Sequence, residues 1–166
     1  MMKSKTHKIV FASLLAALTC VTTMAVKIPT PLGGYVNLGD SIVLLSAAFL
    51  SPLYAVFAAG IGSALADLFS GYVIYAPATL VIKALMALIA YTVIKAFHEK
   101  KKVLAESIGA LLAAIWMVVG YYIFEGFLYG FGASLVNIPA NAIQGAVGAV
   151  LGVVLVQLIE KISPKQ

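Results

Sequence analysis

Two short segments of this chain place polar side chains inside otherwise apolar helices. Residues 75–83 read Tyr-Ala-Pro-Ala-Thr-Leu-Val-Ile-Lys, and residues 136–144 read Val-Asn-Ile-Pro-Ala-Asn-Ala-Ile-Gln. Proline suits the first turn of a helix, where its missing N–H would have no partner in any case. A polar group in hydrocarbon is costly unless it is partnered, so each one marks a candidate functional site. We therefore interpret the two segments as two walls of one pocket.

The polar groups of both segments follow helical spacing. Lys83 lies about 9 Å below the start of its helix, and Thr79 lies one turn before it on the same face. Asn137, Asn141 and Gln144 share one stripe through i, i+4 and i+7 spacing. Both helix starts direct unpaired N–H groups towards the space between them, which suits a ligand with carbonyl, hydroxyl or anionic oxygens. The predicted substrate-binding residues are Lys83, Asn141, Gln144, Thr79, Asn137, Tyr75, Tyr121 and Glu125.

Several polar residues also have a purely structural interpretation. Lys83 could extend to the outer surface along its apolar stem, or form an ion pair with Asp67 at a similar depth. The tyrosines near the outer helix ends could form an interfacial aromatic belt. We expect Asp40 to cap the helix that starts there rather than to contact a ligand. The sequence leaves both ligand contact and ion pairing open for Lys83.

The composition requires a membrane to hold these helices. Of 166 residues, 63% are hydrophobic and 10% are charged, which is far from the composition of soluble domains. A spanning helix needs about 20 mostly apolar residues. We therefore predict an all-α membrane protein with six transmembrane helices, and a single domain over residues 1–166. The helices are expected at 8–26, 40–50, 52–70, 77–97, 103–129 and 139–159, with Ser51 as the cap of the third.

The basic residues set the expected orientation. All eleven are lysines, and an excess of lysine marks the cytoplasmic side of a membrane protein. One side of the six predicted spans holds Lys3, Lys5, Lys8, Lys95, Lys100, Lys101, Lys102, Lys161 and Lys165. Only Lys27 falls on the other side, so both termini are predicted to be cytoplasmic and the two polar helix starts external. Since the lysines follow topology, they do not indicate nucleic-acid binding.

The first helix has two special features. Its start resembles a signal peptide with a potential cleavage site at 23–25, although its apolar run is longer than a usual signal core. Ala12 and Ala16 form a small-residue face that could serve a partner helix, because close helix approach in lipid requires small side chains. Similar pairs, which predict tight packing within the bundle, are Gly60/Ala64, Gly62/Ala66, Gly109/Ala113 and Gly148/Gly152.

Catalytic motifs are missing from the sequence. No Gly-Lys dipeptide occurs, so the phosphate-binding loop of ATPases is absent. His7 and His98 are far apart, and no Ser/His/Asp set can be assembled on one membrane face. We therefore expect no enzyme activity, no metal and no cofactor. The predicted spans contain Asp67, Lys83 and Glu125, which is little material for a proton relay, so active transport would need an ion gradient or another polypeptide.

Three segments together resemble the substrate-binding S component of energy-coupling factor (ECF) transporters. They are 34–41 (Gly-Tyr-Val-Asn-Leu-Gly-Asp-Ser), 62–71 (Gly-Ser-Ala-Leu-Ala-Asp-Leu-Phe-Ser-Gly) and the 75–83 segment given above. Their order and topology are similar to the branch with riboflavin-, pyridoxine- and hydroxymethylpyrimidine-type members. The resemblance extends over nearly the whole chain, including the long first outer loop and the alanines of the first helix.

This resemblance implies a subunit of the bacterial plasma membrane that captures a small water-soluble vitamin outside the cell with high affinity. It implies a transmembrane coupling subunit and two ABC-type ATPases as partners, with Ala12 and Ala16 at the coupling contact. The loop 27–39 would act as a lid. Trp116 is the single tryptophan, which disfavours the aromatic-sandwich pocket of thiamin-type members.

The pocket residues indicate a class of substrate rather than one compound. One lysine, two amides and several phenols suit a neutral or weakly charged heteroaromatic ring with hydroxyl groups. A phosphorylated compound would need more positive charge. We therefore expect a pyridoxine- or pyrimidine-like vitamin, with riboflavin next and a queuosine precursor after it. The alternatives are an autonomous ion-coupled carrier or channel, or a structural membrane assembly factor, which would leave the amides without a task.

Overall fold

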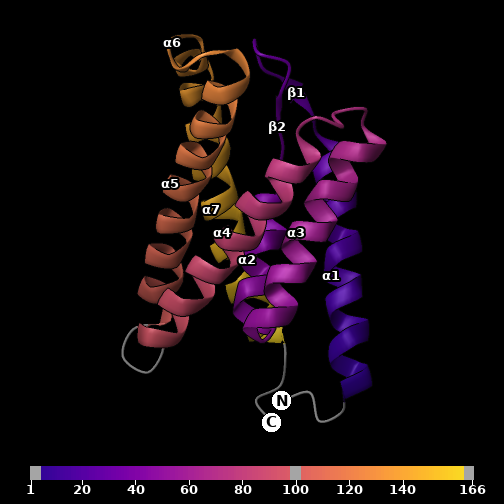
Figure 1. The fold of residues 1–166 in the computed structure, drawn as a ribbon. Coiled ribbons are helices and arrows are strands. Elements are labelled where there is room, and N and C mark those ends of the chain that lie inside the picture. Colours follow the sequence, from indigo (N-terminus) through magenta and orange to yellow (C-terminus); the bar gives the residue numbers. More distant parts are fainter. Residues whose placement is uncertain (1–4, 98–101, 163–166) are drawn as a thin grey trace.

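The computed structural model describes residues 5–97 and 102–162, and helices make up nearly all of this part of the chain (Figure 1). The elements are α1 (Lys5–Ala25), β1 (Ile28–Pro29), β2 (Tyr35–Val36), α2 (Asp40–Phe49), α3 (Pro52–Phe69), α4 (Ala76–Phe97), α5 (Lys102–Tyr129), α6 (Phe131–Ser134), a 3₁₀ turn (Leu135–Asn137) and α7 (Ile138–Ile162). The predicted all-α fold is confirmed, and the six predicted helices end within a few residues of α1–α5 and α7.

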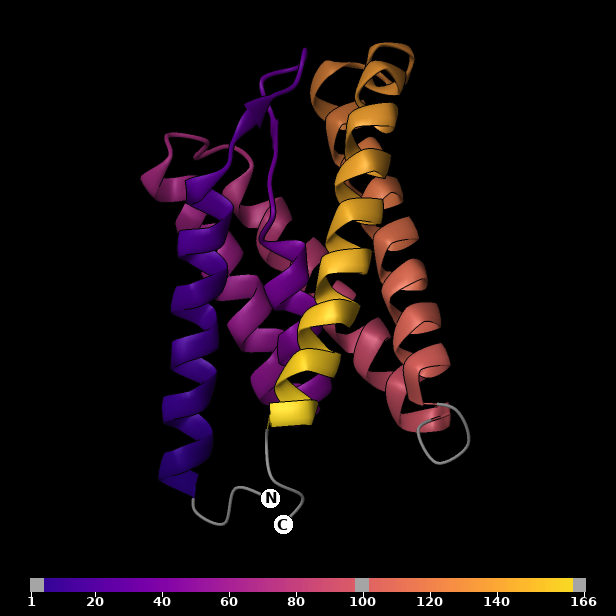
Figure 2. The same cartoon turned by 180° about the vertical axis from the view of Figure 1, so that it is seen from behind.

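Within the described residues, five segments are long and apolar enough to cross a membrane. They are α1, α3, α4, α5 and the continuous stretch Phe131–Ile162, which contains α6 and α7. The remaining helix, α2, has 10 residues and spans only about 15 Å. Seen from behind, α2 lies between α1 and α7 (Figure 2).

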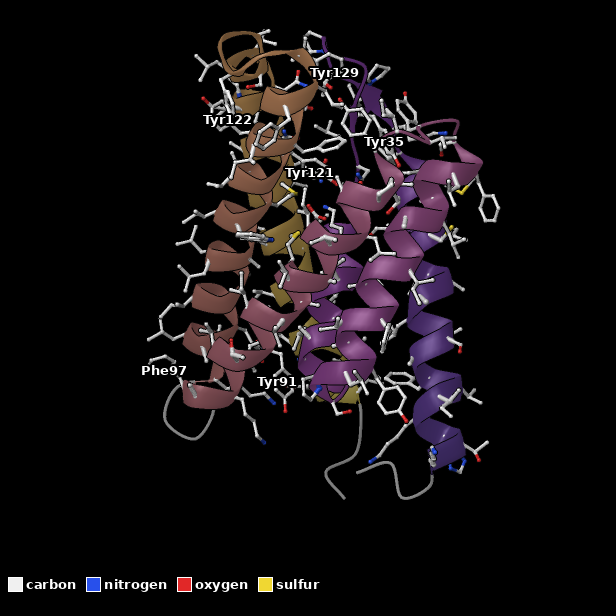
Figure 3. The ribbon with its side chains drawn as sticks, in the orientation of Figure 1. Tyr35, Tyr91, Phe97, Tyr121, Tyr122 and Tyr129 are labelled. Atoms are coloured by element: carbon white, nitrogen blue, oxygen red, sulfur yellow. The ribbon has the colours of Figure 1, made fainter. Side chains whose placement is uncertain are left out.

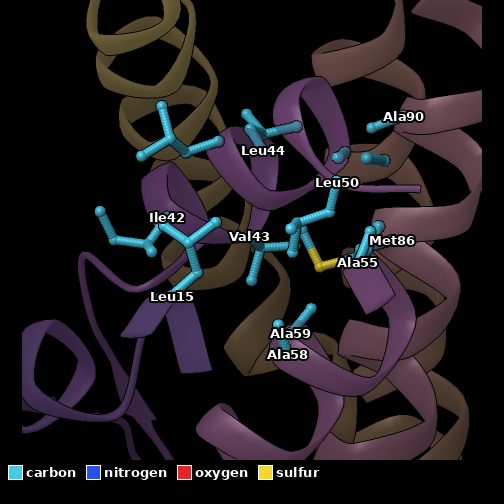
Figure 4. Close-up of a cluster of buried hydrophobic side chains, with 14 of the residues drawn as sticks. Leu15, Ile42, Val43, Leu44, Leu50, Ala55, Ala58, Ala59, Met86 and Ala90 are labelled. Atoms are coloured by element: carbon cyan, nitrogen blue, oxygen red, sulfur yellow. The ribbon is translucent and has the colours of Figure 1, made fainter. Parts of the chain in front are cut away.

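Helix α2 forms the centre of the core. Residues 40–47 are all buried, and α2 contacts α1, α3, α4 and α7. A helix that is apolar on every side must be surrounded by others, and α2 meets this requirement. Ile42, Val43 and Leu44 belong to one buried hydrophobic cluster with Leu15 of α1 and Met86 of α4 (Figure 4).

The glycines predicted to allow tight packing lie at helix contacts. A Cβ atom added at Gly60 of α3 would lie 2.8 Å from the carbonyl oxygen of Leu80 in α4. At Gly62 it would clash with the carbonyl oxygen of Ala16 in α1. At Gly152 of α7 it would meet the side chain of Leu44. Small residues therefore bring the backbones of these helices close together, as expected in lipid.

Two short features of the connecting segments were not predicted. In the loop 27–39, β1 and β2 form an antiparallel hairpin that pairs Ile28 with Val36 and Pro29 with Tyr35. The loop after α5 holds α6 and the 3₁₀ turn. Strands of two residues are too short to show an alternating pattern, so the hairpin could not be predicted from the sequence.

The lysines of the described residues gather at one end of the bundle. Lys5, Lys8, Lys95, Lys102 and Lys161 lie at the helix ends opposite to β1, β2 and α6, whereas Lys27 directly precedes β1 and Lys83 is buried. Tyr35, Tyr121 and Tyr129 lie towards the hairpin end, whereas Tyr91 lies near the other (Figure 3). This distribution of lysines fits the predicted topology. The other lysines assigned to this side, Lys3, Lys100, Lys101 and Lys165, lie outside the described residues. That the lysine-rich end is cytoplasmic stays a prediction.

Candidate ligand-binding site

A small cavity lies below the hairpin, where α1, α3, α4, α5 and α7 meet. Its lining consists of polar side chains almost throughout: Thr23, Thr30, Gly34, Tyr35, Asn37, Ser63, Asp67, Tyr75, Thr79, Lys83, Tyr121, Glu125 and Asn141. The cavity volume is about 20 Å³, which is room for roughly one water molecule. The two polar helix starts predicted from the sequence do form walls of one space.

Lys83 is held by a buried network beside this cavity. Its ammonium group forms an ion pair with Asp40 of α2, and both side chains are 2% exposed. Gln144 of α7 donates from Nε2 to the other Asp40 oxygen at 2.9 Å and accepts the Asn37 N–H at 2.9 Å. The sulfur of Met117 lies 3.2 Å from Lys83 Nζ. The network therefore joins α2, α4 and α7 to the end of the hairpin loop.

This network corrects two expectations. Asp67 is not the ion-pair partner of Lys83, because Asp40 occupies that position. Asp40 does not cap α2: the cap position belongs to Gly39, and the Asp40 carboxylate binds Lys83 and Gln144 instead. Ser51 does occupy the cap position of α3, but its side chain makes no capping hydrogen bond. A buried charge needs a partner more than a helix end needs a cap.

Asp67 and Glu125 are two buried carboxylates on other walls of the cavity. The Tyr35 hydroxyl donates to Asp67 Oδ1 at 2.6 Å, and Asn137 Nδ2 donates to Glu125 Oε1 at 2.8 Å. The Tyr75 hydroxyl lies 3.2 Å from Glu125 Oε1 and 3.0 Å from the Leu32 carbonyl oxygen. Each carboxylate thus uses one oxygen for a protein partner.

Two phenols of the connecting segments stay protonated and act as donors. Burial raises the pKa of Tyr35, and the hydrogen bond and charge of Asp67 raise it further. Burial likewise raises the pKa of Tyr75, with the charge of Glu125 as the next cause. Deeper in the site, Thr79 Oγ1 and the Tyr121 hydroxyl are 3.0 Å apart. The hydroxyls therefore form a neutral hydrogen-bonding layer around the carboxylates.

Some buried oxygens in this region have no partner. Among the residues that the structure describes, they are Thr23 Oγ1, Thr30 Oγ1, Ser63 Oγ, Asp67 Oδ2, Glu125 Oε2 and Asn137 Oδ1. All but Asn137 belong to residues that line the cavity. Buried polar atoms are nearly always hydrogen-bonded, and each exception requires an explanation. Their concentration around one cavity makes this cavity the candidate ligand-binding site, and the carboxylate and amide oxygens among them can accept hydrogen bonds.

The predicted binding residues are brought together at this site. Six of them line the cavity: Tyr75, Thr79, Lys83, Tyr121, Glu125 and Asn141. Gln144 and Asn137 are buried behind the lining, where Gln144 donates a hydrogen bond to Asp40 and Asn137 donates one to Glu125. Sequence reasoning missed the role of Thr23, Thr30, Tyr35, Asn37, Ser63 and Asp67 in the lining. Asp67 gave a signal as a carboxylate inside a span, whereas Thr23 and Ser63 gave none because hydroxyl residues are common in apolar helices. Thr30, Tyr35 and Asn37 lie in the segment between α1 and α2, where no periodic pattern marks which side chains face inward.

Two further observations concern residues outside the cavity. The sequence indicated three ionisable residues within the spans, but Asp40 and Glu106 are also buried in helices. Among the described residues, no group of three or more His, Cys, Asp or Glu side chains could hold a metal ion. His98 lies outside the described residues.

The alanines of α1 face the bundle. Ala12 is buried, and the carbonyl oxygen of Ala16 lies against Gly62 of α3. The next residues along the helix, Ser13 and Ala17, are exposed. The small-residue face predicted for an external partner is therefore partly covered by α3, since Ala12 is buried and Ala16 half-buried, and a second small-residue pair lies beside it on the surface.

Comparison with known proteins bears directly on this architecture. A model of the family described as ECF-type riboflavin transporter, S component, matches residues 3–161. The chain belongs to this family. This chain is also similar in structure to a solved S component of a bacterial ECF transporter. The TM-score is 0.74, the sequence identity is 22%, and the match covers 98% of this chain and 100% of the other. At that identity the likeness concerns the fold.

Two curated proteins are also similar in sequence to this S component. A Pyrococcus woesei protein, described as an uncharacterized protein in a gap 3' region, is 37% identical over 142 residues, or 85% of this chain and 93% of its own. The thiamine precursor transporter HmpT of Lactococcus lactis subsp. cremoris is 43% identical over 51 residues, or 31% of each chain. The chain is thus a multi-pass membrane protein with the family and fold of transporter S components.

Proposed function

We propose that this chain is the high-affinity substrate-binding subunit of an ATP-driven vitamin uptake transporter. In this proposal it has no enzyme activity of its own, and it works with a coupling subunit and two ABC-type ATPases in the bacterial plasma membrane. The family membership supports the transport role. The observation that carries the proposal is the set of unpartnered buried oxygens around one cavity. We expect residues 1–166 to act as one integral-membrane domain.

The chemistry of the cavity favours one class of substrate. Carboxylate and amide oxygens only accept hydrogen bonds, and unpartnered ones remain on Asp67, Glu125 and Asn137. The only lysine of the lining is already neutralised by Asp40. A substrate with several N–H or O–H donors and no phosphate fits these conditions. We therefore propose an aminopyrimidine or a pyridoxine-like vitamin.

The similar proteins support two candidate substrates, a thiamine precursor and riboflavin. HmpT transports a thiamine precursor, although it matches less than a third of the chain. The family description names riboflavin, which keeps riboflavin as the next candidate, with a queuosine precursor after it. Riboflavin carries hydroxyl donors on its side chain but needs a much larger space than an aminopyrimidine.

Binding requires the site to open. Pockets for small organic ligands have volumes of about 300–1,000 Å³, whereas this cavity has about 20 Å³. The hairpin loop closes it through contacts of Tyr35 with Asp67, of Leu32 with Tyr75 and of Asn37 with Gln144. We propose that residues 27–39 are the lid, which moves away from α3 and α4 to admit the vitamin from outside.

Coupling is proposed to use the small-residue face of α1. Ala12 is buried at the floor of a groove beside α3 and Ala16 is half-buried, so α3 leaves only part of this face open to a partner. Ser13 and Ala17 offer an exposed alternative one residue further along the helix. Tryptophan at Ala17 should abolish uptake and leave substrate affinity unchanged if the exposed pair is the contact. If only tryptophan at Ala16 does so, the predicted pair is the contact.

The most direct test identifies the substrate. A tightly bound vitamin should co-purify with the detergent-solubilised chain, and mass spectrometry of the denatured supernatant would identify it. Calorimetric titration with an aminopyrimidine, pyridoxine and riboflavin would then rank their affinities. If none of the three binds, the proposed substrate class is wrong. Uptake against a gradient by the chain alone in liposomes would instead favour an autonomous carrier.

Matched variants of α4 and α7 test the location of the site. Thr79→Val and Asn141→Ala each remove a polar group of the cavity, and each should weaken binding by about 1–3 kcal/mol. Thr92→Val is the control, because its hydroxyl bonds its own helix at the Ile89 carbonyl oxygen and is exposed. If all three variants bound the vitamin as tightly as the wild type, the binding site would lie elsewhere in the protein.

A further inference from the structure

A second and much larger cavity opens at the opposite end of the bundle. Its volume is about 690 Å³. It lies where α1, α4, α5 and α7 have their lysine-rich ends and where α2 turns into α3. Lys8, Lys95 and Lys102 line it together with the phenols of Tyr54 and Tyr91. No part of the vitamin site extends into this space, so the cavity requires a separate explanation.

The charges of this cavity are only partly balanced. Lys102 forms an ion pair with Glu160, and Glu106 accepts a hydrogen bond from Gln157. Lys8 and Lys95 have no ion-pair partner among the described residues. The neutral amide of Gln157 does not cancel the charge of Glu106, so the three lysines and two glutamates of the lining leave a net charge of +1 that favours an anion.

An apolar groove adjoins the charged cavity on the outside of the bundle. It has a volume of about 180 Å³ and runs between α1 and α3, with Ile9, Ala12, Phe57 and Ala58 in its walls. Tyr54 lines both spaces. Ile9 and Phe57 are exposed on the bundle surface, which in a membrane faces the acyl chains. The two spaces together match an amphiphile with an anionic head and an apolar tail.

We propose that this cavity binds the headgroup of an anionic phospholipid from the leaflet at the lysine-rich end. The phosphate lies between Lys8 and Lys95, and one acyl chain follows the groove between α1 and α3. Basic pockets between transmembrane helices on the cytoplasmic side are suited to anionic headgroups. The groove distinguishes a lipid from free phosphate, which has no apolar part. This binding uses no residue of the proposed vitamin site, but the groove includes Ala12, one of the residues proposed for the coupling contact.

Native mass spectrometry of the full-length chain in detergent tests the proposal. Phosphatidylglycerol, phosphatidylcholine and inorganic phosphate are titrated separately. We expect about tenfold tighter binding of phosphatidylglycerol than of phosphatidylcholine, and no displacement of the lipid by millimolar phosphate. The double variant Lys8→Gln/Lys95→Gln should bind both lipids equally. The control Lys5→Gln/Lys161→Gln removes the same charge at the same end outside this cavity, and it should keep the preference.

Three results would overturn the proposal. If the wild type bound both lipids equally, the cavity would not recognise an anionic headgroup. If the control variant also lost the preference, the preference would come from the overall charge of this end and not from the cavity. Displacement of phosphatidylglycerol by inorganic phosphate would show a phosphate site without a lipid. Thermal unfolding of each variant verifies its fold, and the single variants Lys8→Gln and Lys95→Gln replace the double variant if it does not fold.

Discussion

Replacing Lys83 with methionine should destabilise the protein strongly, because Asp40 would remain buried as an unpaired charge. Both side chains are 2% exposed, so water cannot replace the lost ammonium group. The Gln144 amide at 2.9 Å would be the remaining side-chain donor to Asp40. Removing one partner of a buried ion pair typically costs about 3–5 kcal/mol. For a chain of this size, that corresponds to a decrease in Tm of roughly 6–20 °C.

The double variant of Lys83 and Asp40 should recover part of this loss of stability. Lys83→Met with Asp40→Asn removes both charges and keeps an amide that Gln144 can still reach. We expect it to regain about 2 kcal/mol or more of the loss, a coupling energy typical of residues in direct contact. Asp40→Asn alone should also be destabilising, because it leaves the ammonium group of Lys83 buried without a counter-charge.

Unfolding of the four proteins by SDS in mixed micelles, followed by far-UV circular dichroism, measures these differences. Calorimetric titration of each with the co-purified vitamin separates stability from binding. A single variant as stable as the wild type, or a double variant no more stable than Lys83→Met, would refute the ion-pair argument. If Lys83→Met instead kept its stability and lost more than tenfold in affinity, Lys83 would be a ligand contact.

Three further predictions follow from the lid and from helix packing. Tyr35→Phe removes the donor to Asp67 and should speed vitamin release by about five- to tenfold, as measured by stopped-flow fluorescence. Because burial raises the pKa of Tyr35 above its usual value of 10, the contribution of this bond to stability should be constant below pH 10. It should be lost as the pH rises further, so the Tm difference between wild type and Tyr35→Phe should shrink only above pH 10. Gly62→Val drives a side chain into the Ala16 carbonyl and should lower the Tm by several degrees, whereas Gly132→Val, whose added Cβ meets nothing within 4 Å, should not.

Helix positions and the general location of the site could be predicted because they depend on local rules. Apolar length predicts a span, and a proline followed by a buried lysine or amide marks a polar helix start in hydrocarbon. These rules correctly predicted that Thr79, Lys83 and Asn141 line one cavity. They could not predict the partner of Lys83, because Asp40 lies 43 positions away on another helix.

The sequence by itself determined the membrane class, the helices and the small residues at their contacts, since hydrophobicity, proline and glycine act over one or two turns. Only the tertiary structure decided which charges meet. It paired Lys83 with Asp40 and left Asp67 to the hairpin through Tyr35. The physical reason is that ion pairing and desolvation depend on distances between helices, and the packing of α2 at the centre of the bundle sets those distances.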